Sequence, residues 1–448
     1  MKYRSTRGAM AQTLDDALLS GIAADGGLFV PEALPQFHTD DFDGADSTLD
    51  IAKILLTPFF EGSRLADELD GILLETFDFP LPLTRLPVDT GGADLLELFH
   101  GPTAAFKDVG AGFLAACLCR LEQAAVTPLT ILVATSGDTG GAVAAAFNER
   151  PGIYVVVLFP DGRVSERQTH QLTCWGDNVL SLAVQGSFDD CQRLVKSAMA
   201  DESLCEQYRF SSANSINIGR LLPQCTYYAA TSLRHWRETG RRPGFIVPTG
   251  NLGNAFACIM TREMGLPIGE VVLATNANRI IADYLAGSEW SPRASIPTLA
   301  SAMDVGNPSN MERLRDLLGD ADAIKKHIRV FTASDKNIEQ QIRQNYAAFG
   351  LAICPHTATA TYAYQQLSQA VKDANDWIIV ATAHPAKFEL IVEPLIGDVV
   401  PLPGSLQEIQ SKPSRSVSIN ADMSSFKRAL HDRFCLDGDA QGSINSVD

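Results

Sequence analysis

The stretch TILVATSGDTGG, residues 130–141, decides the fold class of this chain. Its first half is short, apolar and rich in β-branched residues, as expected for a strand buried on both faces of a parallel sheet. The glycines that follow form a loop, and a helical pattern begins at Gly141. A strand, a glycine-rich loop and a helix in this order are typical of an open α/β sheet.

The same alternation continues along most of the chain. Further short apolar runs predict strands, and amphipathic or small-residue stretches between them predict helices. We therefore expect an α/β fold with two open, twisted, mostly parallel sheets flanked by helices, plus an N-terminal α+β unit. The predicted strands are 130–135, 153–159, 179–184, 245–248, 271–275 and 378–381, and the predicted helices between them are 141–148, 188–200, 218–236, 254–264, 338–349, 357–371 and 385–396.

Composition shifts predict four regions. Residues 1–90 form an N-terminal unit, because helical patterns there end at a proline-rich joint. A smaller α/β domain carrying Lys107 is expected over 91–230, and a larger one over 231–402. The region 403–448 is a polar tail that contains a pattern for one docking helix.

Composition and charge exclude several classes of function. The chain has 448 residues, 46% of them hydrophobic, which is enough for a sizeable core. A net charge of −17 without any basic run argues against binding nucleic acid or an anionic membrane. Nine scattered cysteines and eight histidines show no metal-ligand spacing, so we expect reduced thiols and no metal site. With no signal core and no membrane-length stretch, the expected location is the cytoplasm.

A second stretch, HGPTAAFKD at residues 100–108, places a lysine where a loop becomes a helix. Gly101 and Pro102 break the preceding element, and small apolar residues follow Asp108. Burial lowers the pKa of a lysine amine, and a neutral amine can form a Schiff base with an aldehyde. The alternative is that Lys107 extends its amine to solvent beside a helix cap.

Two glycine-rich loops follow predicted strands, where ligands bind in open α/β folds. They are TSGDTGG at 135–141 and TGNLGN at 249–254, and each leads into a helix. Such a loop offers backbone N–H groups and a helix dipole to an anion, although it also serves as a packing device. Neither loop has the Walker or the GxGxxG spacing. Two anion sites and a Schiff-base lysine together indicate a phosphate-bearing aldehyde cofactor and an anionic substrate.

Two further polar clusters have structural alternatives. In NSINIGR, 214–220, Arg220 could meet an anion, whereas Asn214 or Ser215 could simply cap a helix. In TAHPAKFE, 382–389, His384 is either a ligand or a capping or core histidine. Lys387 is either a substrate contact or a charge on the helix surface, and the surface position is favoured.

HGPTAAFKD, ATSGDTG, NSINIGR, PTGNLGN and TAHPAKFE occur in the order and spacing used by threonine synthases. The chain resembles that family from residue 3 to about residue 397, and STRG (5–8) and DGGLFVP (25–31) resemble its longer bacterial and fungal branch. The resemblance implies a fold-type II enzyme with pyridoxal 5'-phosphate (PLP) as cofactor. It also implies O-phospho-L-homoserine as substrate, converted with water to L-threonine and phosphate.

The resemblance also implies roles for individual residues, with Lys107 as the catalytic lysine that binds PLP. One departure from the family pattern is Cys354 before Pro355-His356, where many relatives carry an acid. The implied PLP contacts are Phe106 beside the ring, Thr382 at the pyridine nitrogen, Asp138 where some relatives have asparagine, and Gly250, Asn251, Leu252, Gly253 and Asn254 at the phosphate. The implied substrate contacts are Thr103, Ser136, Thr139, Ser215, Asn217, Arg220 and Lys387.

Three alternative functions stay open at this point. Another fold-type II lyase, such as a threonine or serine dehydratase, needs the same lysine and phosphate loop. A lyase acting on phosphorylated amino acids would stop after elimination. A non-catalytic ligand-binding α/β protein is the alternative from a different class. The assembly is expected to be a monomer or a homodimer, with a small molecule as the only partner.

Overall fold

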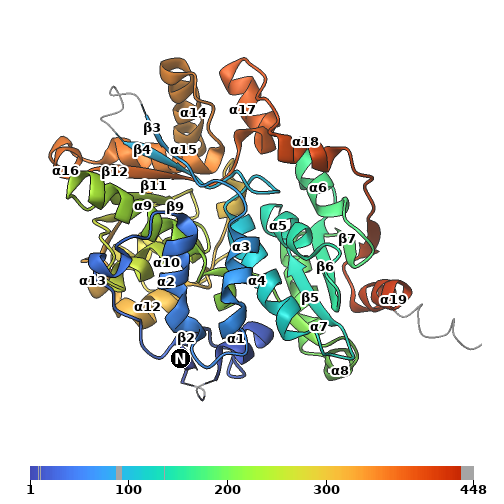
Figure 1. Cartoon of the computed structure of the whole chain (residues 1–448). Coiled ribbons are helices and arrows are strands. Elements are labelled where there is room, and N and C mark those ends of the chain that lie inside the picture. The colour runs from blue at the N-terminus through green and yellow to red at the C-terminus, as the bar shows by residue number, and fades with distance from the viewer. Residues whose placement is uncertain (9, 11, 87–92, 136, 435–448) are drawn as a thin grey trace, which may run out of the picture. The chain divides into compact units, whose positions relative to one another are not determined.

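Buried strands form two mainly parallel sheets, each the centre of one compact unit (Figure 1). The computed structural model describes residues 1–434 except 9, 11, 87–92 and 136. Unit 1 comprises residues 1–121 and 212–408, and unit 2 comprises 122–211 and the chain from 409 onward. The two sheets and the additional N-terminal sheet confirm the predicted fold class.

Unit 1 is built on the six-stranded sheet, in the order β11-β10-β9-β12-β4-β3. All neighbouring strands are parallel except β3, which runs antiparallel to β4. Its strands are β3 (Leu83–Arg85), β4 (Asp94–Glu97), β9 (Gly244–Pro248), β10 (Val271–Thr275), β11 (Ile328–Thr332) and β12 (Trp377–Ala381). Its helices from residue 107 onward are α4 (Lys107–Leu121), η4 (Ile218–Arg220), α9 (Gln224–Thr239), α10 (Gly253–Glu263), α11 (Ile280–Leu285), η5 (Ser301–Met303), α12 (Met311–Leu318), α13 (Ala321–Ile324), α14 (Asp335–Phe349), α15 (Pro355–Gln366), α16 (Gln369–Ala374), η6 (Pro385–Phe388), α17 (Glu389–Ile396) and α18 (Gly404–Gln410).

The N-terminal segment belongs to unit 1 and forms a two-stranded antiparallel sheet with helices around it. Helix α2 packs against α3 and α9, and the Phe60 ring meets the edge of the Phe113 ring of α4 at 6.0 Å between centroids. Its elements are β1 (Tyr3–Ser5), α1 (Leu14–Ser20), β2 (Phe29–Pro31), η1 (Thr39–Phe42), α2 (Thr48–Phe60), η2 (Ala66–Glu68) and α3 (Leu69–Thr76).

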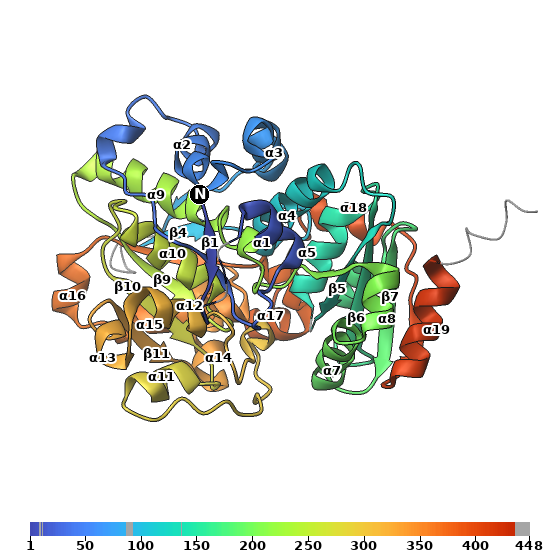
Figure 2. The same ribbon diagram turned by 90° about the horizontal axis from the view of Figure 1, so that it is seen from below.

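Unit 2 is built on a five-stranded sheet, in the order β13-β7-β6-β5-β8. Strand β13 adds to the edge in parallel with β7, and α19 buries Phe426 and Leu430 in the same core (Figure 2). The region expected as a polar tail with a docking helix thus completes this sheet. Its elements are β5 (Leu129–Ala134), α5 (Asp138–Phe147), β6 (Ile153–Pro160), α6 (Glu166–Thr173), β7 (Val179–Gln185), α7 (Phe188–Met199), α8 (Glu202–Tyr208), β8 (Phe210–Ser212), β13 (Val417–Asn420) and α19 (Met423–Phe434).

The two units differ from the domains expected from chain order. The sequence predicts Lys107 in a domain separate from the 249–254 loop, yet both lie in unit 1. The physical reason is that β4, just before Lys107, pairs with β12 in the middle of the unit 1 sheet. The chain leaves this unit after Leu121 and returns at Ser212, so the sequence order hides the grouping.

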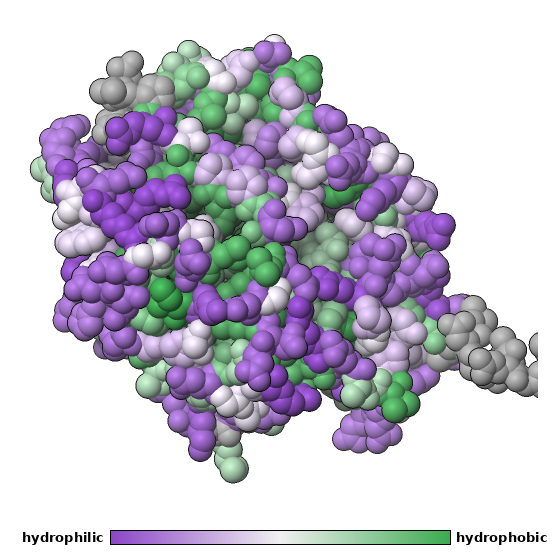
Figure 3. All heavy atoms as spheres, in the orientation of Figure 1, coloured by the Kyte–Doolittle hydropathy of each residue, from purple (hydrophilic) through white to green (hydrophobic). Residues whose placement is uncertain are grey.

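The surface is mixed, as Figure 3 shows for one face, with hydrophobic spheres at the end that carries α14 and α17. Leu390 and Val399 there are 73% and 71% exposed. Exposed apolar side chains of this kind are common on folded proteins. Among the described residues, no helix has the length and apolar character needed to cross a membrane.

Candidate functional site

Lys107 is the first residue of α4, and its backbone is attached to the end of β12. The Phe106 N–H donates to the Thr382 carbonyl at 2.8 Å, and the His384 N–H donates to the Ala104 carbonyl at 3.0 Å. These bonds form an antiparallel bridge between Ala105 and Ala383. The half-buried Lys107 amine lies 5.9 Å from the centre of the Phe106 ring. The structure thus brings Phe106, Lys107 and Thr382 together, as the sequence predicts.

The loop before Lys107 contains a strained residue. Ala104 has a φ of +53°, a left-handed conformation that costs an ordinary residue about 1 kcal/mol. Leu252 in the 249–254 loop has a φ of +64°. Strain of this kind persists only where the surroundings enforce it, and it gathers at functional sites. Two of the loops predicted to carry chemistry therefore share a feature that sequence patterns do not reveal.

Asp108 organises the backbone of the Lys107 loop. Its carboxylate accepts the Thr103 N–H at 2.9 Å and the Thr103 hydroxyl at 2.5 Å. Burial raises the pKa of the Asp108 carboxyl, while the Thr103 hydroxyl and the positive charge of Lys387 oppose that rise. A Cβ at Gly101 would lie 2.6 Å from Oδ2 of Asp108, so only glycine allows this packing.

Lys387 is not a surface charge, and the favoured expectation for it is wrong. Its side chain is 0% exposed, and its Nζ donates to the Thr103 carbonyl at 2.6 Å. The physical reason is that η6 follows β12 directly, so its lysine faces the Lys107 loop. His384 caps η6 by accepting the Ala386 N–H at 3.2 Å on Nδ1, and burial lowers its pKa to about 4.

The 249–254 loop connects β9 to α10, is closely packed, and is the candidate cradle for an anion. A Cβ at Gly250 would lie 2.7 Å from Cα of Met303, so the loop and the 302–303 backbone touch directly. Asn251 fixes the loop by donating to Ser215 Oγ at 2.6 Å and accepting the Ser309 N–H at 2.6 Å. The N-terminus of α10 contributes free N–H groups and a positive dipole.

Asn254 adds a buried donor to this cradle. Tyr227 and Tyr228 both approach its Oδ1, at 2.5 and 2.9 Å. Burial raises the pKa of both phenols well above the usual value, so they stay protonated and donate. This arrangement leaves Asn254 Nδ2 buried without a partner among the described residues. A buried amide donor of this kind is costly unless an acceptor meets it, and a phosphate oxygen is a suitable acceptor.

The 214–220 segment supplies one cation, Arg220, and one side chain with a structural role, Asn217. The Asn217 amide donates to the carbonyls of Leu18 and Ser212 and caps η4 by accepting the Gly219 N–H at 3.0 Å. Arg220 is only 4% exposed and donates to the Ala213 carbonyl at 2.6 Å and to the Lys107 carbonyl at 3.3 Å. The Arg220 guanidinium therefore lies beside Lys107.

Arg313 is a functional candidate that sequence analysis missed. Its fully buried guanidinium donates to the carbonyls of Phe29, Ser215 and Ile216 and to Asn310 Oδ1. It therefore ties the N-terminal sheet to the segment that carries Ser215. The amphipathic pattern of 311–318 gives no signal that one arginine points inward.

The 135–141 loop lies in unit 2 and has its own internal bonds. The Thr135 hydroxyl accepts the N–H groups of Gly137 and Gly140 at 3.0 and 2.9 Å. Asp138 begins α5 and accepts from Gln168 Nε2 at 3.2 Å. Ser136 lies outside the described residues. The cofactor role of Asp138 and the substrate roles of Ser136 and Thr139 stay predictions.

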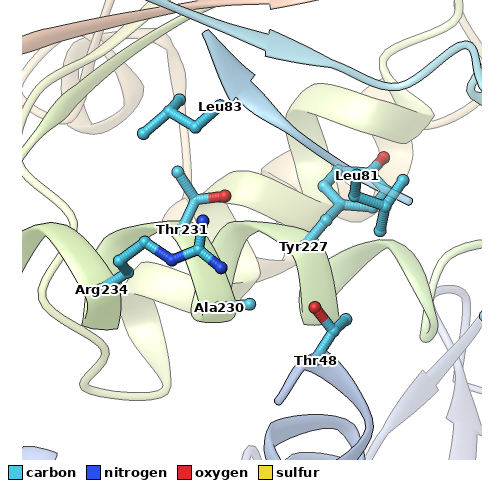
Figure 4. A pocket seen from close by; sticks show the side chains of 7 residues that line it. All are labelled: Thr48, Leu81, Leu83, Tyr227, Ala230, Thr231 and Arg234. Atoms are coloured by element: carbon cyan, nitrogen blue, oxygen red, sulfur yellow. The ribbon is translucent and has the colours of Figure 1, made fainter. Parts of the chain in front are cut away.

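A small, open crevice lies beside α9, and none of the predicted site residues lines it (Figure 4). Its one cation is Arg234, and the Tyr227 side chain at its wall sends its hydroxyl to Asn254. Within the described part of the chain, no group of three or more His, Cys, Asp or Glu could hold a metal ion. The Lys107 region therefore stays the candidate site.

Comparisons with known proteins show which family the chain resembles. The model of the family "Pyridoxal-phosphate dependent enzyme" matches residues 80–383, "Threonine synthase N terminus" matches 2–77, and "Threonine synthase, C-terminal" matches 357–430. Threonine synthase of Escherichia coli strain K12 is 37% identical over 418 residues, covering 92% of this chain and 95% of that protein.

Solved structures of threonine synthases are similar over almost the whole chain. The PLP-bound enzyme from Brucella melitensis has a TM-score of 0.89 and 32% identity, covering 97% of this chain and 99% of that one. The yeast enzyme has a TM-score of 0.89 and 28% identity, with the same coverage of both chains. The ordered motifs, the lysine loop and these similarities lead to one conclusion: the chain belongs to the threonine synthases, within the family of PLP-dependent enzymes.

Proposed function

We propose that this chain converts O-phospho-L-homoserine and water to L-threonine and phosphate, with PLP bound at Lys107. One observation carries the proposal: the Phe106 N–H, next to Lys107 in the chain, donates to the Thr382 carbonyl at 2.8 Å. The fold of unit 1 therefore joins the backbone segments that carry Lys107 and Thr382, in the same unit as the 249–254 loop. Family membership supports the same activity.

The residues present fit PLP. Asn254 Nδ2 is a buried donor without a described partner, and the backbone of Gly250 and the start of α10 complete a cradle for a phosphate group. Thr382 would accept or donate a hydrogen bond at the pyridine nitrogen, and Phe106 would pack beside the ring. When bound, PLP supplies an electron sink that stabilises negative charge on the substrate carbons.

Lys107 is proposed to carry the protons of the reaction. Its neutral amine would take the proton from Cα of the substrate and pass it on, which frees the amine to take a second proton from Cβ. The bond between Cγ and the phosphate oxygen then breaks, and phosphate leaves with the bonding electrons. The lysine returns one proton to Cγ, water adds its hydroxyl to Cβ while its other proton offsets the one that phosphate takes up, and a proton returned to Cα gives threonine. A single base can serve these steps because all three carbons are neighbours in one substrate. Positioning of this amine is therefore the main task of the surrounding loop.

Arg220 and Ser215 are proposed as donors to the anionic groups of the substrate. Arg220 keeps a positive charge because burial lowers its pKa only to about 10, while the charge of Asp108 opposes the shift. Thr103, Asn217 and Lys387 each bond within the protein, and Lys387 in particular acts on Thr103. The chain's overall negative charge makes a local cation necessary for an anionic substrate.

A product assay on the full-length chain loaded with PLP tests the proposed function. We expect visible cofactor absorbance and equal amounts of threonine and phosphate from O-phospho-L-homoserine. The product 2-oxobutyrate in place of threonine would indicate a lyase that stops after elimination. A protein that stays colourless with PLP would contradict the cofactor assignment itself.

Gly250→Ala is expected to weaken PLP binding by about 10- to 100-fold. The new Cβ would meet Met303 Cα at 2.7 Å, and the three nearest atoms all belong to the backbone of 302–303, so the cradle must shift. A titration of PLP by absorbance measures the change. Gly112→Ala is the matched control, because a Cβ there meets nothing within 4 Å. Equal PLP affinity in G250A and wild type would show that the cradle lies elsewhere.

The remaining assignments concern assembly and location. We propose a monomer or a homodimer, a choice that sedimentation can decide. We also propose a cytoplasmic location, supported by the buried free thiols of Cys117, Cys225 and Cys258, which suit a reducing compartment.

A further inference from the structure

In the loop before Lys107, the N–H and carbonyl groups of Thr103 and Ala104 are all hydrogen-bonded. The Thr103 N–H donates to Asp108 Oδ2, and the Thr103 carbonyl accepts Lys387 Nζ at 2.6 Å. The Ala104 N–H donates to the Gly101 carbonyl at 3.0 Å, and the Ala104 carbonyl accepts the His384 N–H. These bonds flank the one left-handed residue of the loop, Ala104, whose side chain is fully buried.

Two of these contacts come from buried charged side chains. Lys387 is 0% exposed and Asp108 is 5% exposed; Asp108 accepts the Thr103 N–H, and Lys387 donates to the Thr103 carbonyl. Charged groups are seldom buried this deeply for packing alone, because desolvation is expensive. The reaction proposed above gives neither side chain a step, and both bond to Thr103 of the loop.

We propose that Lys387 and Asp108 are positioning residues that clamp Thr103 and thereby force Ala104 into its left-handed conformation, which sets the direction of Lys107. The proposal rests on the proposed function, because it gives the clamp the task of orienting the PLP-binding lysine. It replaces the expected substrate contact of Lys387 with an action through the backbone. The bond between Lys387 Nζ and the Thr103 carbonyl is the part of the clamp that a single substitution can remove.

The clamp predicts a specific effect of Lys387→Met. Without the Nζ donor, Ala104 can relax from its left-handed conformation and Lys107 turns away from its working direction. We expect kcat to fall about 100-fold with KM within about threefold, because misplacement of a reacting group by about 1 Å has effects of this size. We also expect PLP to attach to Lys107 more slowly, by about 10-fold or more. Borohydride traps the attached cofactor, and mass spectrometry locates it on the chain.

A rescue experiment separates positioning from general stabilisation. Glycine adopts the left-handed conformation without strain, so Ala104→Gly keeps the loop in place even when the clamp is weakened. We expect Ala104→Gly to improve kcat and PLP attachment about 10-fold more in K387M than in wild type. Lys336→Met is the matched control, because this lysine is exposed on α14, and we expect no change there.

Each outcome decides the proposal. If K387M attaches PLP and turns over substrate like wild type, or if Ala104→Gly gives no extra gain in K387M, the clamp is wrong while the proposed function stands. If the wild-type protein itself attaches no PLP at Lys107, the proposed function is wrong, and the clamp proposal that rests on it is wrong as well. Should K387M not fold, K387M/D108N removes both charges, and the Ala104→Gly comparison in that background then decides between the same two outcomes.

Discussion

Lys107→Ala is expected to lower kcat by at least about 10⁴-fold while the protein stays folded. The substitution removes the one amine proposed to move protons at Cα, Cβ and Cγ. It also removes the covalent attachment of PLP, and both losses lower the rate. The Lys107 side chain is half-buried at the start of α4, where alanine suits a helix well. The backbone bonds of Phe106 and Asp108 do not depend on the lysine side chain. The loss therefore reports chemistry rather than unfolding.

The measurements for this prediction are threonine formation, visible absorbance with PLP, and the melting temperature. K107A is expected to keep the melting temperature of the wild-type protein without PLP, while the absorbance of lysine-bound cofactor disappears. Lys336→Ala, at an exposed site on α14, is the control for replacing a lysine and should behave as wild type. Threonine formation by K107A within about tenfold of wild type would contradict the role of Lys107.

Six strands of the two sheets could be predicted from sequence because burial on both faces leaves a strong signal. Runs such as 153–159 and 271–275 are almost purely apolar, and the structure places β6 and β10 there. The four-residue strand β4 is buried but is not predicted from the sequence. Edge strands lack this signal: β11 is buried only at its first residue, and β13 is mostly exposed. Neither edge strand is predicted from the sequence for that reason. The grouping of Lys107 with β12 is also hidden, since pairing between β4 and β12 joins segments far apart in the chain.

Among the candidate site residues, sequence motifs indicated those in loops after strands but not the buried residues that support them. Motifs located Lys107, Thr382 and the 249–254 loop, because loops at the carboxyl ends of strands meet in α/β folds. The residues that hold the site in place went unrecognised, since their role depends on which way a side chain points. Lys387 and Arg313 are cations whose burial no periodicity indicates. Cys354 at the family's acid position proved to be a buried helix cap that accepts the Thr357 N–H at 3.4 Å.

Arg220→Met is expected to lower kcat/KM for O-phospho-L-homoserine by about 10³-fold. A buried charge normally has an ionic partner, yet the bonds of this guanidinium are to the carbonyls of Ala213 and Lys107. No described carboxylate forms an ion pair with it, and its Nε is buried without a described partner. The charge of Asp108 acts on Arg220 without an ion pair between them, so an anion of the substrate would supply a direct partner, next to the proposed catalytic Lys107.

The close packing of α4 against Arg220 requires glycine at position 110. A Cβ at Gly110 would lie 2.7 Å from the Arg220 carbonyl oxygen and 3.0 Å from its Nε, so α4 needs glycine there. Burial lowers the pKa of Arg220 to about 10, which keeps it charged at neutral pH. Because the charged form is required, activity should stay level up to about pH 9 and then fall with the loss of this proton.

Arg220→Lys separates charge from shape. Lysine keeps the positive charge but loses the planar fork that can donate to two oxygens, so we expect a loss of about 10- to 100-fold, smaller than in R220M. PLP attachment at Lys107 should stay within about threefold of wild type in both variants, since the proposed anchors of the cofactor are Lys107 and the 249–254 loop. A loss of PLP attachment equal to the loss of kcat/KM would mean that Arg220 supports the Lys107 backbone instead of the substrate. R220M with kcat/KM close to wild type would exclude both roles, because a buried cation without function should be replaceable by an apolar side chain of similar length.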